Sequence, residues 1–311
     1  MAALVVGVGL LCYFVTRSDT EQLRSALWQA GPWVPVLAGL EAILLATDTA
    51  AFASLVAPAS GISAAAWLRS TAAANVCFVF LPAGRVFGEA IRAGLASPHV
   101  GAPRAAMAGA ELQAVALLAD GLISALGGAV IGSTISQAHH LAGALAANAV
   151  LLGVAGAGLL LAIRSVRARS WLVGRFPALA KVVPAGSAGP VRAVRSACAW
   201  SMVGRLLRVL QCGIAIAAVG GVFGIRSAVL AHGLHMLSAT VGVAIPNQLG
   251  VADGAYVLFA DTLGFASSPG RALAAILALR GAQVALAAVC LAAVALIRAP
   301  ATALSTESAG Q

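Results

Sequence analysis

The sequence predicts an all-α membrane protein, a polytopic bundle of about seven or eight spanning helices, two of them broken or re-entrant. The first observation is composition: 61% of the 311 residues are hydrophobic and 9% are charged, against about 25% charged in soluble domains. The second is length, which accommodates that many spans of about 20 residues with short connections. The third is an apparent internal duplication, in which two apolar runs are each interrupted by a proline and paired glycines.

The apolar runs are separated by short polar stretches, and each is long enough to form a membrane helix or part of one. The first run has no basic residue before its apolar core, so we interpret it as a helix and not as a cleaved signal. Residues 17–35, which follow it, are polar and amphipathic and are expected at the membrane interface. The expected helices are 1–16, 36–57, 62–81, 103–135, 141–163, 196–219, 228–245 and 269–297.

The second expected span carries two carboxylates. Glu41 and Asp48 are seven residues apart and therefore share one helical face. Acidic groups at membrane depth are costly unless they face protein or water, so the pair indicates a polar lumen. For Glu41, wetting by the headgroup region near the helix end is an equal alternative.

The stretch IPNQLGVADGAYVLFADTLGF, residues 245–265, is the most unusual in the chain. Proline and glycine interrupt helices, and at membrane depth such breaks are tolerated only beside protein or a wet cavity. The same arrangement follows Pro82, which lies 164 residues before Pro246, and broken helices in matching halves point to a transport site. The alternatives are that residues 245–265 form a loop and helix start, and that the two stretches match by chance. Each proline precedes two glycines four apart and a carboxylate, namely Gly84, Gly88 and Glu89 in one copy and Gly250, Gly254 and Asp253 in the other.

Residues 164–195 form the longest polar connection, with seven cations and no acidic residue. The positive-inside rule places such a segment in the cytoplasm. The net charge of +9 fits contact with anionic headgroups better than nucleic-acid binding. The chain is therefore divided into an N-terminal membrane half (1–163), a basic cytoplasmic loop (164–195), a C-terminal membrane half (196–298) and a disordered tail (299–311).

The sixth expected span carries Arg205, Arg208 and Gln211 at a spacing of three, which predicts a polar stripe on one helix face. The sequence between Asp120 and Asp253 contains no acidic residue, so any partner is expected from a distant segment, with Asp253, Glu89 or Glu111 as candidates. The alternative is that this helix begins later and that the arginines lie on the cytoplasmic surface. His232 and His235 are expected to pack or hydrogen-bond inside the bundle rather than bind a metal.

The stretch NVCFVFLPAGRVFGEAIRAGL resembles the first signature of the flippase-like integral membrane family related to the transmembrane region of lysylphosphatidylglycerol synthase. The second signature, a proline followed by Gly-Val-x-Glu-Gly, is similar to residues 246–254, and the tyrosine that follows is similar to hopanoid-associated members. The sequence departs from the pattern where Asp253 replaces glutamate and where Asn247 and Gln248 replace glycines. The positions that match are Asn75, Pro82, Gly84, Arg85, Gly88, Glu89 and Arg92 in the first signature and Pro246, Gly250, Val251, Asp253 and Gly254 in the second.

The resemblance implies a lipid translocase of the inner (plasma) membrane that moves a lipid, with an anionic headgroup, between leaflets. The alternative is a non-catalytic accessory subunit that docks a lipid-modifying or envelope-glycan biosynthesis enzyme through the basic loop. We expect neither enzymatic activity, nor a cofactor or metal, nor nucleic acid as partner. Asp253 is expected to pair with Arg205 or Arg208 and to serve transport rather than stability. The expected substrate-binding residues are Pro82, Arg85, Glu89, Arg92, Arg205, Arg208, Pro246, Gly250, Asp253 and Gly254.

Overall fold

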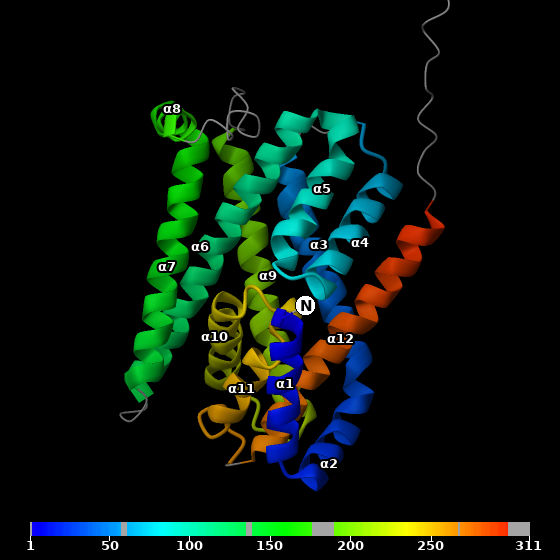
Figure 1. The fold of residues 1–311 in the computed structure, drawn as a ribbon, viewed down its shortest axis with the longest axis vertical. Helices are drawn as coiled ribbons and strands as arrows, with labels where there is room; N and C mark the ends of the chain where they lie inside the picture. The colour runs from blue at the N-terminus through cyan, green and yellow to red at the C-terminus, as the bar shows by residue number, and fades with distance from the viewer. Residues whose placement is uncertain (1, 57–60, 135–138, 176–189, 267, 298–311) are drawn as a thin grey trace, which may run out of the picture.

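The computed structural model describes residues 2–56, 61–134, 139–175, 190–266 and 268–297, and the described chain is helical without strands (Figure 1). The tail after residue 297 and most of the predicted loop, residues 176–189, lie outside the described residues. The helices are α1 (Ala2–Arg17), α2 (Thr20–Ala30), η1 (Gly31–Trp33), α3 (Val34–Val56), α4 (Ala64–Phe80), α5 (Gly84–Val100), α6 (Ala102–Thr134), α7 (His139–Arg164), α8 (Val166–Arg175), α9 (Val191–Ala218), α10 (Ile225–Val241), η3 (Pro246–Gln248), α11 (Val251–Leu258) and α12 (Pro269–Leu296).

Five helical stretches are long and apolar enough to cross a membrane, so the protein is a helical, membrane-embedded bundle. Seven or eight spans were expected. That number is reached only if shorter apolar helices such as α1 and α4 are counted as spans as well. The five stretches are Thr20–Val56, Ala102–Ser133, His139–Arg164, Val191–Ala218 and Pro269–Leu296.

The predicted interfacial linker lies inside one of these stretches. Residues Thr20–Val56 are helical almost continuously, because α2, η1 and α3 follow one another. Leu23 and Ala26 of α2 are buried in the apolar core, whereas Trp28 is exposed. The amphipathic character read from the sequence therefore reflects packing of α2 against the bundle on one side.

Both prolines of the putative duplication mark breaks between helices. Pro82 lies between α4 and α5, which form a hairpin in the upper half of Figure 1, and Pro246 begins η3 between α10 and α11 in the lower half. The two breaks meet: the amide of Ala83 donates a hydrogen bond to the carbonyl of Val243 at 3.1 Å. Segments far apart in the sequence thus approach one another inside the bundle, as expected from the paired motifs, although the contact does not establish that they arose by duplication.

The backbone at the breaks adopts a conformation that residues other than glycine rarely take. Ala83, Asn247 and Gln248 have φ values of 48°, 47° and 50°. A left-handed conformation of this kind costs about 1–3 kcal/mol at a residue with a side chain, and such residues concentrate at functional sites. The surrounding helices must therefore hold both breaks in place.

The glycines of the two motifs serve close helix packing. Gly84 and Gly88 of α5 lie against the backbone and the Phe78 ring of α4. A Cβ atom added to Gly254 would lie 2.5 Å from the ring of Phe14 in α1, and one added to Gly250 would lie 2.6 Å from the Gly7 carbonyl oxygen. Each glycine pair therefore lets a neighbouring helix approach, which a larger residue would prevent.

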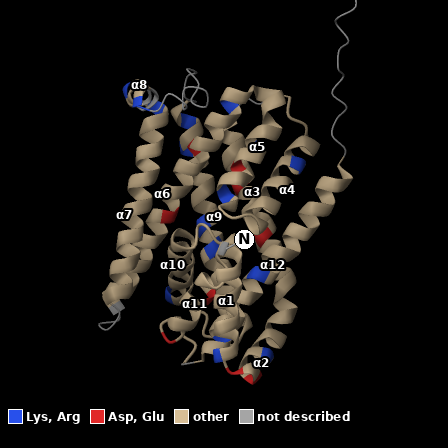
Figure 2. Cartoon of the chain, viewed as in Figure 1, with Lys and Arg blue, Asp and Glu red and all other residues tan. Residues whose placement is uncertain are grey.

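Charge is distributed unevenly between the two ends of the bundle (Figure 2). The end that carries α8 includes the starts of α6 and α9 and is rich in arginine, whereas the opposite end, where α1 connects to α2, carries Asp19 and Glu21 together with Arg17 and Arg24. Part of the segment predicted as a basic loop is helical, since α8 covers Val166–Arg175 and α9 begins at Val191. The cations described at the α8 end are Arg104, Arg164, Arg167, Arg175, Arg192 and Arg195.

Candidate functional site

A cavity of about 410 Å³ opens where the two breaks meet. Ala83 from the first break and Val243, Asn247 and Gln248 from the second all line it. The remaining walls come from α3, α4, α5, α6, α7, α9, α10 and α12. The helix breaks and the cavity therefore form one feature of the molecule.

Charged side chains of both signs line this cavity. The cations are Arg85 from α5 and the pair Arg205 and Arg208 from α9, and the carboxylates are Glu41, Asp48 and Asp120. Formal charges thus balance at three of each sign among the described lining residues. Groups of this kind are expensive at membrane depth and are usually retained for substrate or ion passage.

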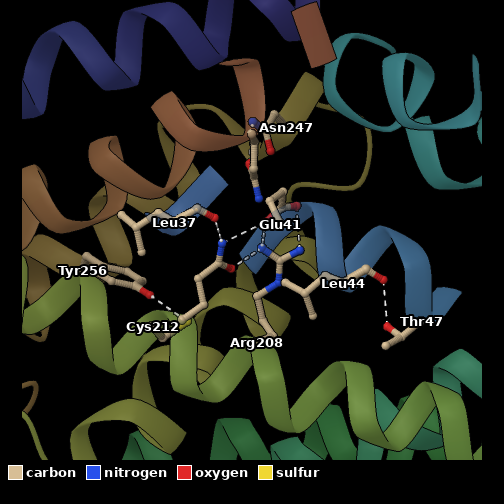
Figure 3. Close-up of polar contacts among 10 residues, drawn as sticks. Leu37, Glu41, Leu44, Thr47, Arg208, Cys212, Asn247 and Tyr256 are labelled. Carbon is tan, nitrogen blue, oxygen red and sulfur yellow. Dashed lines mark hydrogen bonds and ion pairs between the residues drawn. The ribbon is translucent and has the colours of Figure 1, made fainter. Parts of the chain in front are cut away.

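Arg208 is held by a planar, two-point contact with Glu41 (Figure 3). Its Nη2 donates to Glu41 Oε1 at 2.9 Å and its Nη1 contacts Glu41 Oε2, while Nη1 also donates to Gln211 Oε1 at 2.7 Å. The Gln211 amide in turn donates to Glu41 and to the Leu37 carbonyl. A bidentate pair with a supporting amide is a strong, geometrically specific arrangement, so Arg208 is fixed rather than free.

Arg205 and Arg85 share a second carboxylate. Arg205 Nη2 donates to Asp120 Oδ2 at 3.2 Å, and its Nε also contacts this carboxylate. Arg85 reaches the same Asp120 only at 3.7 Å, and its side chain is 36% exposed. Of the three lining arginines, Arg85 is therefore the least committed to a protein partner.

The N-terminus of α5 faces the cavity without a cap. Ala83 supplies no side-chain hydrogen bond, and the first turn holds no acidic residue. The amides of Gly84 and Arg85 donate no hydrogen bond within the described chain, and both residues line the cavity. Free amides and the helix dipole make such a terminus a binding site for anions.

The corresponding terminus of α11 is closed by its own side chain. Asp253 Oδ2 accepts a hydrogen bond from the Gly250 amide at 2.6 Å and lies 3.0 Å from Arg280 Nη1. Asp253 is fully buried. Of the two broken helices, only α5 therefore presents an uncapped N-terminus to the cavity.

Two imidazoles from α10 complete the polar lining. The rings of His232 and His235 stack with centroids 6.4 Å apart, and both residues line the cavity. His232 is completely buried, and neither of its ring nitrogens has a hydrogen-bond partner in the described structure. His232 therefore packs inside the bundle, as expected, but its ring nitrogens keep unused donor and acceptor capacity beside the cavity.

One wall of the cavity is apolar and reaches the outer surface of the bundle. Leu81, Val86 and Val243 line the cavity and are 38%, 59% and 59% exposed. In a membrane, exposed side chains of this kind face lipid tails. The cavity thus combines a charged interior with an apolar side.

The structure separates the expected substrate-binding residues into two groups. Arg85, Arg205 and Arg208 line the cavity, and Pro82 and Pro246 adjoin lining residues at the two breaks. Glu89 and Arg92 instead form a buried pair at 3.3 Å, with the Arg92 guanidinium between the rings of Phe52 and Phe78. Gly250, Asp253 and Gly254 do not line the cavity and lie against α1 and α12.

The expected pairing of Asp253 with Arg205 or Arg208 is wrong. Asp253 pairs with Arg280, because α11 packs against α12, and the arginines of α9 pair with Asp120 and Glu41. Sequence separation suggested remote partners, but relative helix rotation decided which carboxylate each arginine meets. The alternative that the two arginines lie on the cytoplasmic surface is also excluded, because both line the cavity.

Several lining residues were not among those expected to bind substrate. The sequence places Glu41 and Asp48 on one polar helix face without assigning them to the site, and it assigns no role to Asp120. His232 and His235 were treated as packing residues. Their common signal is a polar side chain inside an apolar helix, which the sequence shows without indicating the direction in which it points.

Comparison with models of protein families, with characterised proteins and with solved structures found no match.

Proposed function

We propose that the protein is a lipid translocase, in which the phosphate of a lipid headgroup enters the cavity and binds at the N-terminus of α5 while the acyl chains stay in the bilayer. The observation that carries the proposal is the uncapped α5 terminus beside Arg85. Its free amides and the guanidinium of Arg85, which has only a 3.7 Å contact with Asp120, border the same cavity, and both kinds of group bind anions.

The apolar wall favours a lipid over a water-soluble anion. Val86 and Val243 are exposed where they border the cavity, so a headgroup can occupy the polar interior without withdrawing its tails from an apolar surrounding. A broken helix whose N-terminus points at an anionic substrate is a recurring device of membrane transporters. The proposal also includes the resemblance of residues 75–95 to flippase-like proteins, which implies the same activity.

Orientation follows from the charge asymmetry. We place the arginine-rich end that carries α8 in the cytoplasm of a cell whose inner (plasma) membrane holds the protein, since cytoplasmic connections are enriched in Lys and Arg. The end that carries Asp19 and Glu21 then faces the opposite side.

The test is transport by the purified protein in liposomes that contain phospholipids labelled on an acyl chain. Access of a membrane-impermeant quencher to the label reports movement between leaflets. Arg85→Gln is expected to slow transport by about tenfold or more, which corresponds to about 1.4 kcal/mol. The fold should persist, because Arg85 makes only the 3.7 Å contact with Asp120.

Arg226→Gln is the matched control, since Arg226 is an exposed arginine at the start of α10, away from the cavity lining. It should transport like the unaltered protein. If the unaltered protein moves no lipid above protein-free liposomes, the translocase proposal is wrong and the accessory-subunit hypothesis gains.

A further inference from the structure

Asp48 is a carboxylate of the cavity that has no hydrogen-bond or ion-pair partner among the described residues. It projects from α3, lines the cavity and is partly exposed to it. No hydrogen bond or ion pair within 4.0 Å joins it to any described residue. Glu41, two turns away on the same helix, is by contrast fully engaged by Arg208 and Gln211.

Arg85 lines the same cavity as Asp48 and carries the opposite charge. Asp48 interacts electrostatically with Arg85 and with Arg208, yet neither guanidinium comes within ion-pair distance of it. A cation and an anion thus border one cavity with a gap of more than 4.0 Å between them. In a low dielectric, a carboxylate without an ion-pair partner is costly, and Arg85 has only its 3.7 Å contact with Asp120, so a ligand that carries both charges would satisfy both.

The positive and negative formal charges of the described lining residues are equal in number. Three arginines and three carboxylates face the cavity, so a headgroup with net charge would leave an excess of one sign inside. His232 adds a fully buried side chain with unpaired ring nitrogens among the lining residues.

We infer that Asp48 binds the ammonium group of a zwitterionic phospholipid whose phosphate occupies the α5 N-terminus beside Arg85. This inference rests on the proposed function and specifies its substrate class: a phosphodiester headgroup that carries a primary or quaternary amine and has no net charge. The ammonium pairs with Asp48 and the phosphate with Arg85, so one ligand gives Asp48 an ion-pair partner and gives Arg85 a closer one than Asp120 at 3.7 Å.

The experiment compares two lipids that differ only in the ammonium. Phosphatidylethanolamine and N-acetyl-phosphatidylethanolamine share the phosphate, glycerol and acyl chains, but acetylation removes the positive charge. Liposomes contain one or the other with the same acyl-chain label. The unaltered protein should move phosphatidylethanolamine about tenfold faster, which is about 1.4 kcal/mol of discrimination.

Asp48→Asn should lower the rate for phosphatidylethanolamine to that for the acetylated lipid and leave the latter unchanged. Asp261→Asn, at an exposed carboxylate remote from the cavity lining, should alter neither rate. Equal transport of the two lipids by the unaltered protein, or equal slowing of both by Asp48→Asn, would overturn the inference while leaving translocation intact.

Binding keeps the inference testable if no lipid is transported at all. Glycerophosphoethanolamine and its N-acetyl derivative can be titrated calorimetrically into the purified protein. Tighter binding of the amine that is lost in Asp48→Asn would uphold the ammonium subsite although translocation had failed. Equal binding of both compounds, or binding of neither, would overturn the subsite.

Discussion

Replacement of Asp253 by Asn should destabilise the protein strongly. Asp253 is completely buried, and Arg280, whose side chain is 9% exposed, lies 3.0 Å away. Removing one member of a buried pair leaves an uncompensated charge and costs about 3–5 kcal/mol. Asparagine can still accept the hydrogen bond from the Gly250 amide, so most of the loss comes from Arg280. This expectation differs from the sequence-based hypothesis that Asp253 serves transport and leaves stability intact.

The free energy of unfolding can be measured in mixed micelles by titration with a denaturing detergent, with tryptophan fluorescence as the readout. A second variant, Arg280→Gln, separates the charge pair from other effects. The double variant should lose less than the sum of the single ones, with a coupling of about 1–3 kcal/mol. Asp253→Asn within about 0.5 kcal/mol of the unaltered protein, the range of ordinary surface substitutions, would refute the reasoning.

Three further predictions concern other parts of the bundle. Gly254→Ala should lower the free energy of unfolding by about 1–3 kcal/mol because its methyl group would collide with the Phe14 ring, and adding Phe14→Ala should restore part of that loss; no recovery would contradict the contact. A cysteine that reports the orientation of the basic segment is placed at exposed Ser170 of α8 in a cysteine-free background, because position 187 of that segment lies outside the described residues. It should resist a membrane-impermeant thiol reagent in intact cells, and ready labelling would reverse the orientation. Arg92→Lys should destabilise the protein by about 1–3 kcal/mol through lost stacking and hydrogen bonding without altering which headgroup is preferred, since Arg92 does not line the cavity; a changed preference in the liposome assay would contradict this.

The long helices were predictable because each is an apolar run bounded by polar or helix-breaking residues, whereas the shorter helices α2, α5, α8 and α11 are not among the helices expected from the sequence. The run expected at 269–297 is observed as Pro269–Leu296, and the one expected at 103–135 is observed as Ala102–Thr134. The breaks were predictable for the same local reason, since Pro82 and Pro246 cannot continue a helix without losing a hydrogen bond. Local chemistry therefore accounts for the long apolar helices and for the two breaks.

The charge pairs were not predictable, because they depend on the rotation and height of helices packed from distant segments. Arg205 and Asp120 are 85 residues apart in the chain, and Arg208 and Glu41 are 167 apart. The role of Gly254 in packing was not predictable either, since nothing in the neighbouring sequence indicates that Phe14 of α1 packs against it. A motif can therefore locate an unusual stretch correctly while the residues within it serve packing and not the cavity.

The contrast between the two broken helices allows the proposed anion site to be tested by a transplanted cap. Asp253 is the third residue of α11 and accepts the amide hydrogen bond of Gly250 at the helix start, whereas the third residue of α5 is Val86, which is 59% exposed and lines the cavity. The Ala83 amide, which corresponds to that of Gly250, already donates to Val243, so the carboxylate of Val86→Asp should lie beside the free Gly84 and Arg85 amides instead and occupy the position proposed for the phosphate.

A carboxylate near a helix N-terminus is favourable by about 0.3–1 kcal/mol, but Val86 lies on the apolar side of the cavity, where a charge is costly, so the free energy of unfolding of Val86→Asp is measured beside its transport and rates are compared for folded protein. Transport should fall at least about tenfold, or about 1.4 kcal/mol, because the new carboxylate repels the headgroup and competes for Arg85. Val86→Asn is the matched control: it has nearly the same shape and polarity but no charge, and it should transport faster than Val86→Asp. Equal rates for the two variants would mean that negative charge at the α5 terminus does not matter, and the phosphate would then have to bind elsewhere in the cavity.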